Sequence, residues 1–382
     1  MEIKSVYESS NGATLSRPVA KTLGAQMKMK PVHYIQWQIG PGGIELSIVH
    51  YINYLSGQRK LYAYSLRKAD RRIYDESRIT ITEGNKGGWR LYLEYFKYCR
   101  KYRKDIFHMH NGGPVILLLT LLAGVRNPLY HIHGTIYWHN FVQKLYLKPI
   151  WVFIRGLLLW QKATFIANSN YSAGIFRDKA LPVQPTVVYN GLEVQNFLKK
   201  KSLRTGLRRM AYIGRLYTGK NVDLIIRLFE EIAGDYPELE LHLAGTGSLQ
   251  GELEAQAQKS LYADRIKFLG YVKDIASFYG SVDLFVFMSA YESFGNVVAE
   301  ALLTGLPTLT SNIPVFEEIY GNEKDFILGD PTDYEAVKQK FLKGIEDFPN
   351  LAQKAYALSA SVETQCSIEN HLRQIENIYE KH

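Results

Sequence analysis

Short apolar runs rich in β-branched and aromatic residues alternate with longer helical patterns along most of the chain. In the first half these runs span residues 32–39, 106–110, 129–133, 164–167 and 186–189. In the second half they span residues 210–213, 240–244, 267–269, 284–288 and 308–310. Strands that alternate with helices are typical of βαβ units, which build parallel sheets covered by helices. The pattern therefore predicts an α/β protein.

A polar segment at residues 198–207, with the sequence LKKKSLRTGL, interrupts the alternation. Because α/β patterns stand on both sides of it, we expect two Rossmann-like domains with doubly wound parallel sheets. The predicted domains span residues 31–197 and 208–360, and residues 198–207 form the linker between them. Two such domains would face each other across a cleft, where a ligand is expected.

Both ends of the chain lie outside this pattern. Residues 1–30 lack the apolar centre of a secretory signal peptide, so we interpret them as a loose leader, with Met27 and Met29 as alternative translation starts to Met1. Residues 361–382 are expected to form a C-terminal helix that packs back toward the N-terminal domain. Its apolar stripe has helical spacing and consists of Ile368, Leu372, Ile375 and Tyr379.

Charge divides the chain into halves of opposite sign. Residues 1–190 hold 26 Lys and Arg against 10 Asp and Glu, whereas residues 191–382 hold 20 against 27. The basic first half indicates an anionic partner such as a nucleic acid, a phospholipid surface or a phosphorylated acceptor; a solvated surface without a partner is the alternative. Cys99 and Cys366 stand far apart in the sequence, which indicates neither a zinc site nor a disulfide and fits a reducing, cytoplasmic compartment.

Ligands of open parallel sheets bind where the strands end, so the loops after the predicted strands are candidate sites. The first loop, with Gly42 and Gly43, leads into a helix whose N-terminus favours an anion, although a tight turn would need the same glycines. Another loop follows His131 and His133, which we expect to face opposite sides of the sheet, with Gly134 opening a crevice beside His133. A structural histidine is the alternative there.

The loop after the strand at 210–213 carries Arg215 and Lys220, just before a predicted helix at 222–233. Cations at a helix N-terminus oppose the helix dipole, so a pyrophosphate-sized anion would explain them; two solvated basic residues are the alternative. The sequence AGTGS at residues 244–248 follows the next strand. Its glycines would admit a nucleotide or would only make the turn.

Two carboxylates carry the strongest motif. Glu292 precedes a helix that is predicted to begin near Asn296, and Glu300 lies within that helix. Both can therefore face one ligand that lies along the helix N-terminus. Neither has an obvious neighbouring cation in the sequence. Carboxylates accept pairs of hydroxyl hydrogen bonds, which suits sugar and ribose diols.

Assembled in order, these motifs resemble the retaining glycosyltransferases of family 4 (glycosyl transferases group 1), which have the two-domain GT-B fold. The resemblance covers about residues 31–360. It rests on Gly42-Gly43, His133-Gly134, Asn190-Gly191, the loop from Gly214 to Asn221, the E-x7-E pattern from Glu292 to Glu300, and residues 313–331.

The resemblance implies roles for individual residues. Arg215 and Lys220 would hold the donor diphosphate, Glu300 the ribose hydroxyls, and Glu292 the hydroxyls of the donor sugar, while His133 would lie near the anomeric carbon. The residues expected to bind the donor are Gly43, Gly214, Asn221, Phe294, Gly295, Asn296 and Glu300.

The implied reaction moves a hexose-type sugar from a nucleotide sugar to a glycan or lipid-linked acceptor in cell-surface polysaccharide biosynthesis. Retention would follow a front-face route, in which a phosphate oxygen of the leaving group takes the acceptor proton. The nucleotide sugar is a co-substrate, and neither a cofactor nor a metal is expected. The alternatives are a GT-B sugar-nucleotide epimerase, an inactive GT-B binding module and a basic nucleic-acid-binding protein. No RNP, zinc-finger or helix-turn-helix signature supports the last one, so nucleic acid is not an expected partner.

The segment at residues 141–162 combines large aromatic and basic side chains and is too short and too charged to span a bilayer. Basic residues among aromatics suit the headgroup boundary of an anionic membrane. We therefore expect the first domain to dock peripherally on the inner face of the cell membrane and to take a lipid-linked acceptor there. A core helix with a few exposed cations is the alternative.

Overall fold

The computed structural model describes residues 29–40, 42–84, 87–110, 112–134 and 141–382, without the side chains of residues 141 and 142. The predicted leader, residues 1–30, therefore lies outside the described residues except for its last two positions. The chain divides into two compact units. The first is formed by Met1–Tyr189 together with His371–His382, and the second by Asn190–Asn370.

The first unit is built on a parallel sheet with the strand order β3-β2-β1-β4-β5-β6-β7. Its strands are β1 (Val32–Gln36), β2 (Leu61–Ser65), β3 (Thr80–Glu83), β4 (Ile106–His110), β5 (Leu129–Ile132), β6 (Thr164–Ala167) and β7 (Thr186–Val187). Every residue of β1, β4 and β5 is buried, as is typical of central strands in a sheet that helices cover on both faces.

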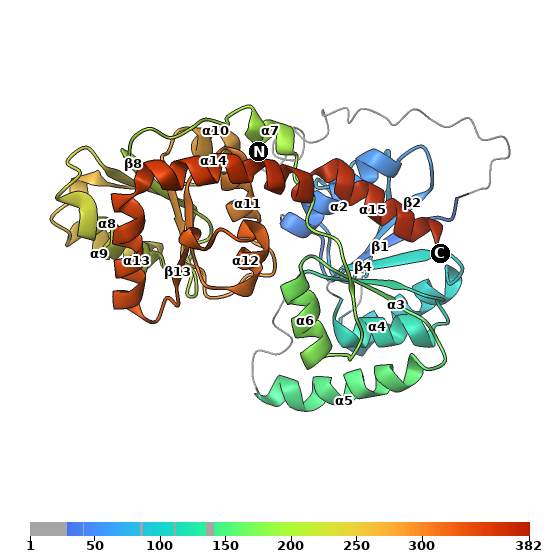
Figure 1. Ribbon diagram of the computed structural model, residues 1–382. Helices are drawn as coiled ribbons and strands as arrows, with labels where there is room; N and C mark the ends of the chain where they lie inside the picture. The colour runs from blue at the N-terminus through green and yellow to red at the C-terminus, as the bar shows by residue number, and fades with distance from the viewer. Residues whose placement is uncertain (1–28, 41, 85–86, 111, 135–140) are drawn as a thin grey trace. The chain divides into compact units, whose positions relative to one another are not determined.

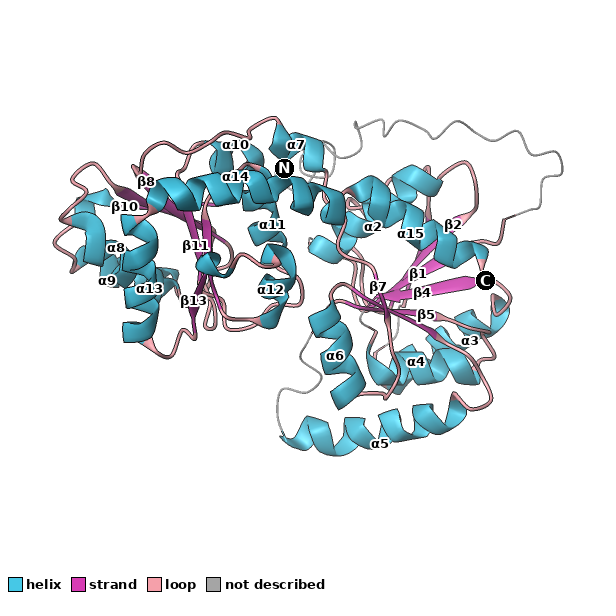
Figure 2. Cartoon of the chain, viewed as in Figure 1, coloured by secondary structure: helices cyan, strands magenta, loops and turns pink. Residues whose placement is uncertain are grey.

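Helices cover both faces of this first sheet. They are α2 (Gly43–Leu55), α3 (Trp89–Lys101), α4 (Gly113–Leu122), α5 (Phe141–Leu157) and α6 (Asn170–Lys179), with α15 (Ile368–Glu380) added from the end of the sequence. Figure 2 shows α2 and α15 on one face and α3 and α4 on the other, with α5 beyond α4.

The second unit repeats this plan, with the strand order β10-β9-β8-β11-β12-β13 and parallel pairing throughout the described ladders. Its strands are β8 (Arg209–Ile213), β9 (Glu240–Ala244), β10 (Ile266–Gly270), β11 (Leu284–Phe287), β12 (Thr308–Ser311) and β13 (Ile327–Gly329). Its helices are α7 (Val194–Leu198), α8 (Val222–Ala233), α9 (Gln250–Gln258), α10 (Ile275–Gly280), α11 (Asn296–Leu303), α12 (Pro314–Tyr320), α13 (Tyr334–Glu346) and α14 (Phe348–Cys366), with short 3-10 turns at Ala263–Arg265 and Lys324–Phe326. The predicted fold class, α/β with two Rossmann-like units, is confirmed.

The segment predicted as a linker, residues 198–207, packs inside the second unit. The chain enters that unit at Asn190, upstream of the predicted boundary. Buried Arg204 donates hydrogen bonds to the main-chain oxygens of Val282, at 2.8 Å, and Tyr279, at 2.9 Å. The polar composition that suggested a free linker thus includes a guanidinium that satisfies buried carbonyls.

The end of the chain joins the first unit (Figure 1). The single helix predicted over residues 361–382 is in fact parts of two helices. Its first residues belong to α14, which begins at Phe348 and ends at Cys366, and the rest form α15, which begins at Ile368. The predicted stripe on α15 is at most 2% exposed at each of its four positions. Two hydrogen bonds tie α15 to α2: Tyr51 Oη with His371 Nε2, at 2.8 Å, and Tyr54 Oη with Glu376, at 2.8 Å.

Candidate active site

The loop after β8 has an unusual backbone that only a few residue types accept. Gly214 and Gly219 have φ angles of +156° and +91°, and Asn221 has a left-handed φ of +50° just before α8. A Cβ at Gly219 would lie 2.9 Å from the Tyr291 ring, so any larger residue there would also clash with this ring. The Asn221 side chain donates to the main-chain oxygen of Met288, at 2.8 Å, and so ties this loop to the end of β11.

The AGTGS turn packs directly against that loop. A Cβ at Gly245 would lie 1.9 Å from the Gly214 oxygen, and one at Gly247 would lie 2.0 Å from the Leu216 oxygen. The main chain of Leu216 also donates to Thr246, at 2.9 Å. These glycines are therefore required by close backbone packing against the neighbouring loop, a reason that neither sequence-based explanation included.

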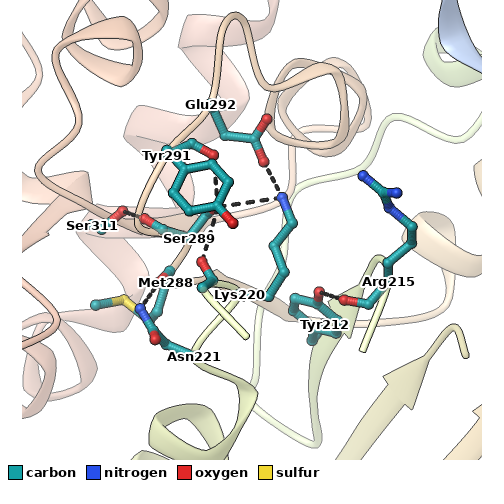
Figure 3. A network of polar contacts seen from close by, with 10 residues as sticks. Tyr212, Arg215, Lys220, Asn221, Met288, Ser289, Tyr291, Glu292 and Ser311 are labelled. Atoms are coloured by element: carbon teal, nitrogen blue, oxygen red, sulfur yellow. Dashed lines mark hydrogen bonds and ion pairs between the residues drawn. The ribbon is translucent and has the colours of Figure 1, made fainter. Parts of the chain in front are cut away.

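Lys220 lies at the centre of the polar network in Figure 3. It is 8% exposed, and its ammonium pairs with the Glu292 carboxylate and donates to Ser289 Oγ at 3.3 Å. It also lies 4.9 Å from the centre of the Phe287 ring. The sequence suggested no neighbouring cation for Glu292, and the structure corrects this: the two residues meet across 72 positions of sequence.

Arg215 is exposed and stands apart from this network (Figure 3). Its guanidinium lies 4.9 Å from the centre of the Tyr217 ring, and among the described residues no carboxylate is within ion-pairing distance of it. Its main-chain oxygen accepts a hydrogen bond from Tyr212 Oη, at 3.0 Å. Arg215 is thus a cation with a fixed backbone and an accessible head group.

The N-terminus of α11 is shaped by Gly295 and Asn296. Gly295 has a φ of +88°, and a Cβ there would lie 2.7 Å from the Phe316 ring. Asn296 accepts a hydrogen bond from the Asn190 side chain, at 2.8 Å, which brings together two of the sequence motifs. Phe294 is buried. The first amides of a helix lack intrahelical acceptors and suit an anion or a hydroxyl oxygen.

Glu300 lies one turn further along α11 and is half-buried. Burial raises its pKa to about 7, while a hydrogen bond from Tyr279 Oη, at 3.4 Å, acts in the opposite direction. Glu300 therefore has a different environment from Glu292, which is paired with a cation. Two residues that sequence reasoning missed, Ser289 and Tyr291, follow β11, where the rule that ligands bind at strand ends would have found them.

His133 belongs to the first unit and follows β5. The expectation that His131 and His133 face opposite sides of the sheet is wrong, since their rings stack with centroids 4.1 Å apart. Residues two apart on a strand share a face. His133 is half-buried, and burial lowers its pKa to about 3.

Gly43 begins α2, and the N-terminus of this helix already faces a carboxylate from its own first turn. Glu45 is 9% exposed and accepts a hydrogen bond from Gln36 Nε2 at 3.0 Å. Burial raises the pKa of Glu45. A Cβ at Gly42 would lie 2.8 Å from its Oε2. Any anion approaching Gly43 would therefore meet Glu45 nearby.

Among the described residues, one group of histidines could share a metal ion: His108, His110 and His131, all buried, with nitrogen atoms within 4.8 Å of one another. Hydrogen bonds engage both ring nitrogens of His108, through Tyr379 at 2.6 Å and His131 at 3.1 Å. These rings form a hydrogen-bonded cluster in the first unit, whereas Arg215, Lys220, Glu292 and Glu300 lie in the second.

Two family models match the chain in succession. Glycosyltransferase Family 4 matches residues 41–196, and Glycosyl transferases group 1 matches residues 194–357. Together they span both units. The chain belongs to the group 1 glycosyltransferases. The resemblance inferred from the motifs is thereby confirmed, and the chain is a glycosyltransferase.

Individual relatives agree with this assignment. The UDP-Gal:alpha-D-GlcNAc-diphosphoundecaprenol alpha-1,3-galactosyltransferase of Escherichia coli is 25% identical over 272 residues, covering 67% of this chain and 70% of that protein. The lipopolysaccharide core biosynthesis mannosyltransferase LpsB of Rhizobium meliloti is 27% identical over 216 residues, covering 52% and 62%. Anabaena HepE (Alr3699), in a crystal structure with UDP and glucose, matches with a TM-score of 0.73 and 19% identity over 92% of this chain and all of that one.

Proposed function

We propose that this glycosyltransferase moves a hexose-type sugar from a nucleotide-sugar donor to a glycan or lipid-linked acceptor, with retention of the anomeric configuration. The observation that carries the proposal is the loop cluster in which Lys220, Glu292 and the N-terminus of α11 lie together at the strand ends of the second unit. Exposed Arg215 stands on the same loop as Lys220. The E. coli relative is named for a UDP-galactose donor and a diphosphoundecaprenol acceptor, and the Anabaena neighbour was crystallised with UDP.

The cations would act on the leaving group. As the bond from the anomeric carbon to the phosphate oxygen breaks, negative charge grows on the diphosphate, and Arg215 and Lys220 would neutralise it. The acceptor oxygen attacks the same face, and its proton passes to a phosphate oxygen of the leaving group. Glu300 would bind the ribose hydroxyls and Glu292 the sugar hydroxyls. We further propose that these two cations make a divalent metal unnecessary, since the sequence has no Asp-x-Asp segment to hold one.

Replacing Lys220 tests this role. We expect Lys220→Ala to lower turnover about 10²- to 10³-fold, as is typical when one preorganised charge is lost. The matched control is Lys324→Ala, which removes an exposed lysine that pairs with Glu317 on the surface of the same unit. A panel of nucleotide sugars in isothermal titration identifies the donor for the assay. Full activity of Lys220→Ala, or loss of wild-type activity in EDTA, would contradict the proposal.

We also propose that the first unit docks peripherally on the anionic cytoplasmic face of the cell membrane through α5, where a lipid-linked acceptor would be presented. Trp151 and Ile154 on α5 are buried in the core, so the core-helix alternative holds for one side of this helix. On its other side, Val152 is 63% exposed and Phe153 57%, and Trp160 just beyond the helix is 89% exposed.

Charge complementarity selects an anionic bilayer as the occupant of this surface. Residues 141–162 contain Lys144, Lys148, Arg155 and Lys162 and no Asp or Glu. Lys144 and Lys148 line a shallow hollow with Leu145, Val152 and Phe153. Each cation near an anionic surface contributes about 1 kcal/mol, and the exposed apolar side chains would enter the headgroup boundary. No helix in the described ranges is both long enough and apolar enough to cross a bilayer.

Sedimentation with vesicles tests the docking surface. The protein should bind vesicles containing phosphatidylglycerol but not pure phosphatidylcholine, and added salt should weaken binding. Replacing Lys144, Lys148 and Arg155 with Glu should abolish it. Replacing three exposed cations of α3, Lys97, Arg100 and Lys101, with Glu changes the net charge equally and should retain most of the binding. Absence of binding to anionic vesicles at low salt, or equal loss in both triple variants, would rule out α5 as the docking surface.

A further inference from the structure

Four histidine rings form a two-rung ladder on one face of the first sheet. His108 and His110 lie on β4, and His131 and His133 lie on and just after β5. Rings that are successive along a strand lie 4.2 Å apart on β4 and 4.1 Å apart on β5, between centroids. Each rung is a hydrogen bond between the strands. His108 Nε2 meets His131 Nδ1 at 3.1 Å, and His110 Nδ1 meets His133 Nε2 at 2.9 Å.

The ladder is electrically neutral around pH 7. Burial lowers the pKa of all four rings, and that of His133 falls to about 3. A neutral imidazole has one N–H and one bare nitrogen, and the hydrogen bond made by one nitrogen decides which of the two carries the proton. Each rung therefore has a direction.

The environment of His110 Nε2, the ring nitrogen outside the rung, decides whether His110 or His133 donates in the hydrogen bond between them. His110 is 2% exposed, and its Nε2 has no hydrogen-bond partner among the described residues. A buried N–H without an acceptor is rarer and costlier than a bare acceptor nitrogen. His110 therefore carries its proton on Nδ1 and donates it to His133 Nε2. Because His133 accepts at Nε2, its own proton lies on Nδ1.

We propose that His110 is a positioning residue, which holds the His133 ring and fixes it in the Nδ1–H form. This inference rests on the proposed function and on the place near the anomeric carbon of the donor sugar that the family resemblance implies for His133. His133 stands at the carboxyl end of β5, where ligands of parallel sheets bind. In this form His133 has no bare nitrogen for the acceptor proton, so His133 does not act as the base, which agrees with the proposed transfer of that proton to the leaving-group phosphate.

Long-range ¹H–¹⁵N spectra of the full chain labelled with [¹⁵N]histidine test the assignment, because they report which nitrogen of each neutral ring carries the proton. His110→Asn and His133→Asn assign the two signals. In the wild type we expect His133 to carry its proton on Nδ1. His133 in the Nε2–H form would overturn the proposal.

Two variants then separate positioning from packing. His110→Leu removes the donor and should leave His133 in a mixture of forms, with kcat lowered about tenfold and UDP affinity changed less than twofold. His110→Asn keeps an amide N–H near the Nδ1 position and should restore both the Nδ1–H form and most of kcat. The matched control is Tyr379→Phe, which removes the hydrogen bond to His108 in the other rung and should lower the melting temperature without changing the form of His133.

The outcomes for the proposal and for the proposed function differ. An Nδ1–H signal for His133 that persists in His110→Leu overturns the positioning role of His110. If nucleotide sugars do not bind the wild type, the proposed function of the site fails. If His133→Asn transfers sugar at the wild-type rate, the place of His133 beside the donor sugar fails. In both cases the spectra still decide the direction of the rung.

Discussion

The ion pair between Lys220 and Glu292 joins a residue expected to hold phosphate to one expected to hold sugar. Both side chains are mostly buried, at 10% and 19% exposed. Removing one partner of such a pair leaves the other charge poorly compensated. The Glu292 carboxylate thus already pairs with the Lys220 ammonium that is proposed to bind the diphosphate. The carboxylate and the diphosphate would therefore compete for Lys220.

This competition changes what is expected of Glu292 variants. A role limited to sugar binding would leave nucleotide affinity unaffected, but the ion pair predicts that Glu292→Gln binds the free nucleoside diphosphate about three- to tenfold more tightly, because Lys220 loses its competing anion. Sugar transfer should fall. Isothermal titration with the nucleoside diphosphate of the donor that the panel identifies measures the first effect, and Glu335→Gln, on α13, serves as the control. Weaker nucleoside diphosphate binding by Glu292→Gln would contradict the competition.

Much of the site could be predicted at this scale, because glycines, cations and carboxylates that directly follow parallel strands often belong to a ligand site. The pairing of Lys220 with Glu292 could not, since it joins positions 72 apart through the parallel order of β8 and β11. The ladder of His108 and His110 with His131 and His133 was missed for the same reason. Sequence spacing shows which residues share a strand face, but the strand register decides which rings meet.

At the scale of elements, the AGTGS turn acts as a support for the loop that carries Arg215 and Lys220. We expect Gly247→Ala to weaken binding of the donor nucleotide and to destabilise the second unit by about 1 to 3 kcal/mol, as is usual for overpacking, because the new Cβ would overlap the Leu216 oxygen. Gly251→Ala on α9 is the matched control: its Cβ meets nothing within 4 Å, and alanine favours a helix. Urea unfolding and titration with this nucleotide distinguish the two variants, and equal behaviour would contradict the supporting role.

The elements that the sequence did not predict are mostly short strands at or near sheet edges. The missed strands are β2, β3 and β13, of which β3 and β13 are edge strands. An edge strand such as Thr80–Glu83 is partly polar and short, so its pattern is weak. Among the inner strands, β4, β6 and β9 match their predicted runs to the residue, whereas the run at residues 32–39 extends three residues past the end of β1. Helix ends that depend on a backbone turn, such as the break between α14 and α15, leave little trace in the periodicity.

At the scale of the whole molecule, histidines are as unevenly distributed as charge. Nine of the ten belong to the first unit. Burial lowers the pKa of His50 and His371 to about 4 and that of His133 to about 3, and it also lowers the pKa values of His108, His110 and His131 well below the ordinary one. Unfolding exposes these rings, whose pKa then returns to about 6.5, so the unfolded state binds more protons at acidic pH.

The first unit should therefore lose stability as the pH falls below about 6.5, toward 4, by on the order of 1 kcal/mol per pH unit for each such ring. The raised pKa of Glu300, about 7, acts in the opposite direction in the second unit, because its folded state takes up the proton more readily. All five tryptophans lie between residues 37 and 160, so their fluorescence reports on the first unit alone. Urea unfolding at pH 7.5 and 5.5 should show the fluorescence midpoint falling further than a second transition in circular dichroism. Equal shifts would contradict this account.

The first unit is discontinuous in sequence, which determines the order in which the chain can fold as it is synthesised. Residues 371–382 are translated after the whole of Asn190–Asn370, yet they carry His371 and Tyr379, which bond to Tyr51 and His108. Until residues 371–382 leave the ribosome, α15 cannot pack on the face of the first sheet that carries the histidine ladder. The second unit has all its residues earlier, so it can complete its fold while the first, although begun sooner, still waits for its final helix. The usual rule that the N-terminal domain is finished first is thus reversed in this chain.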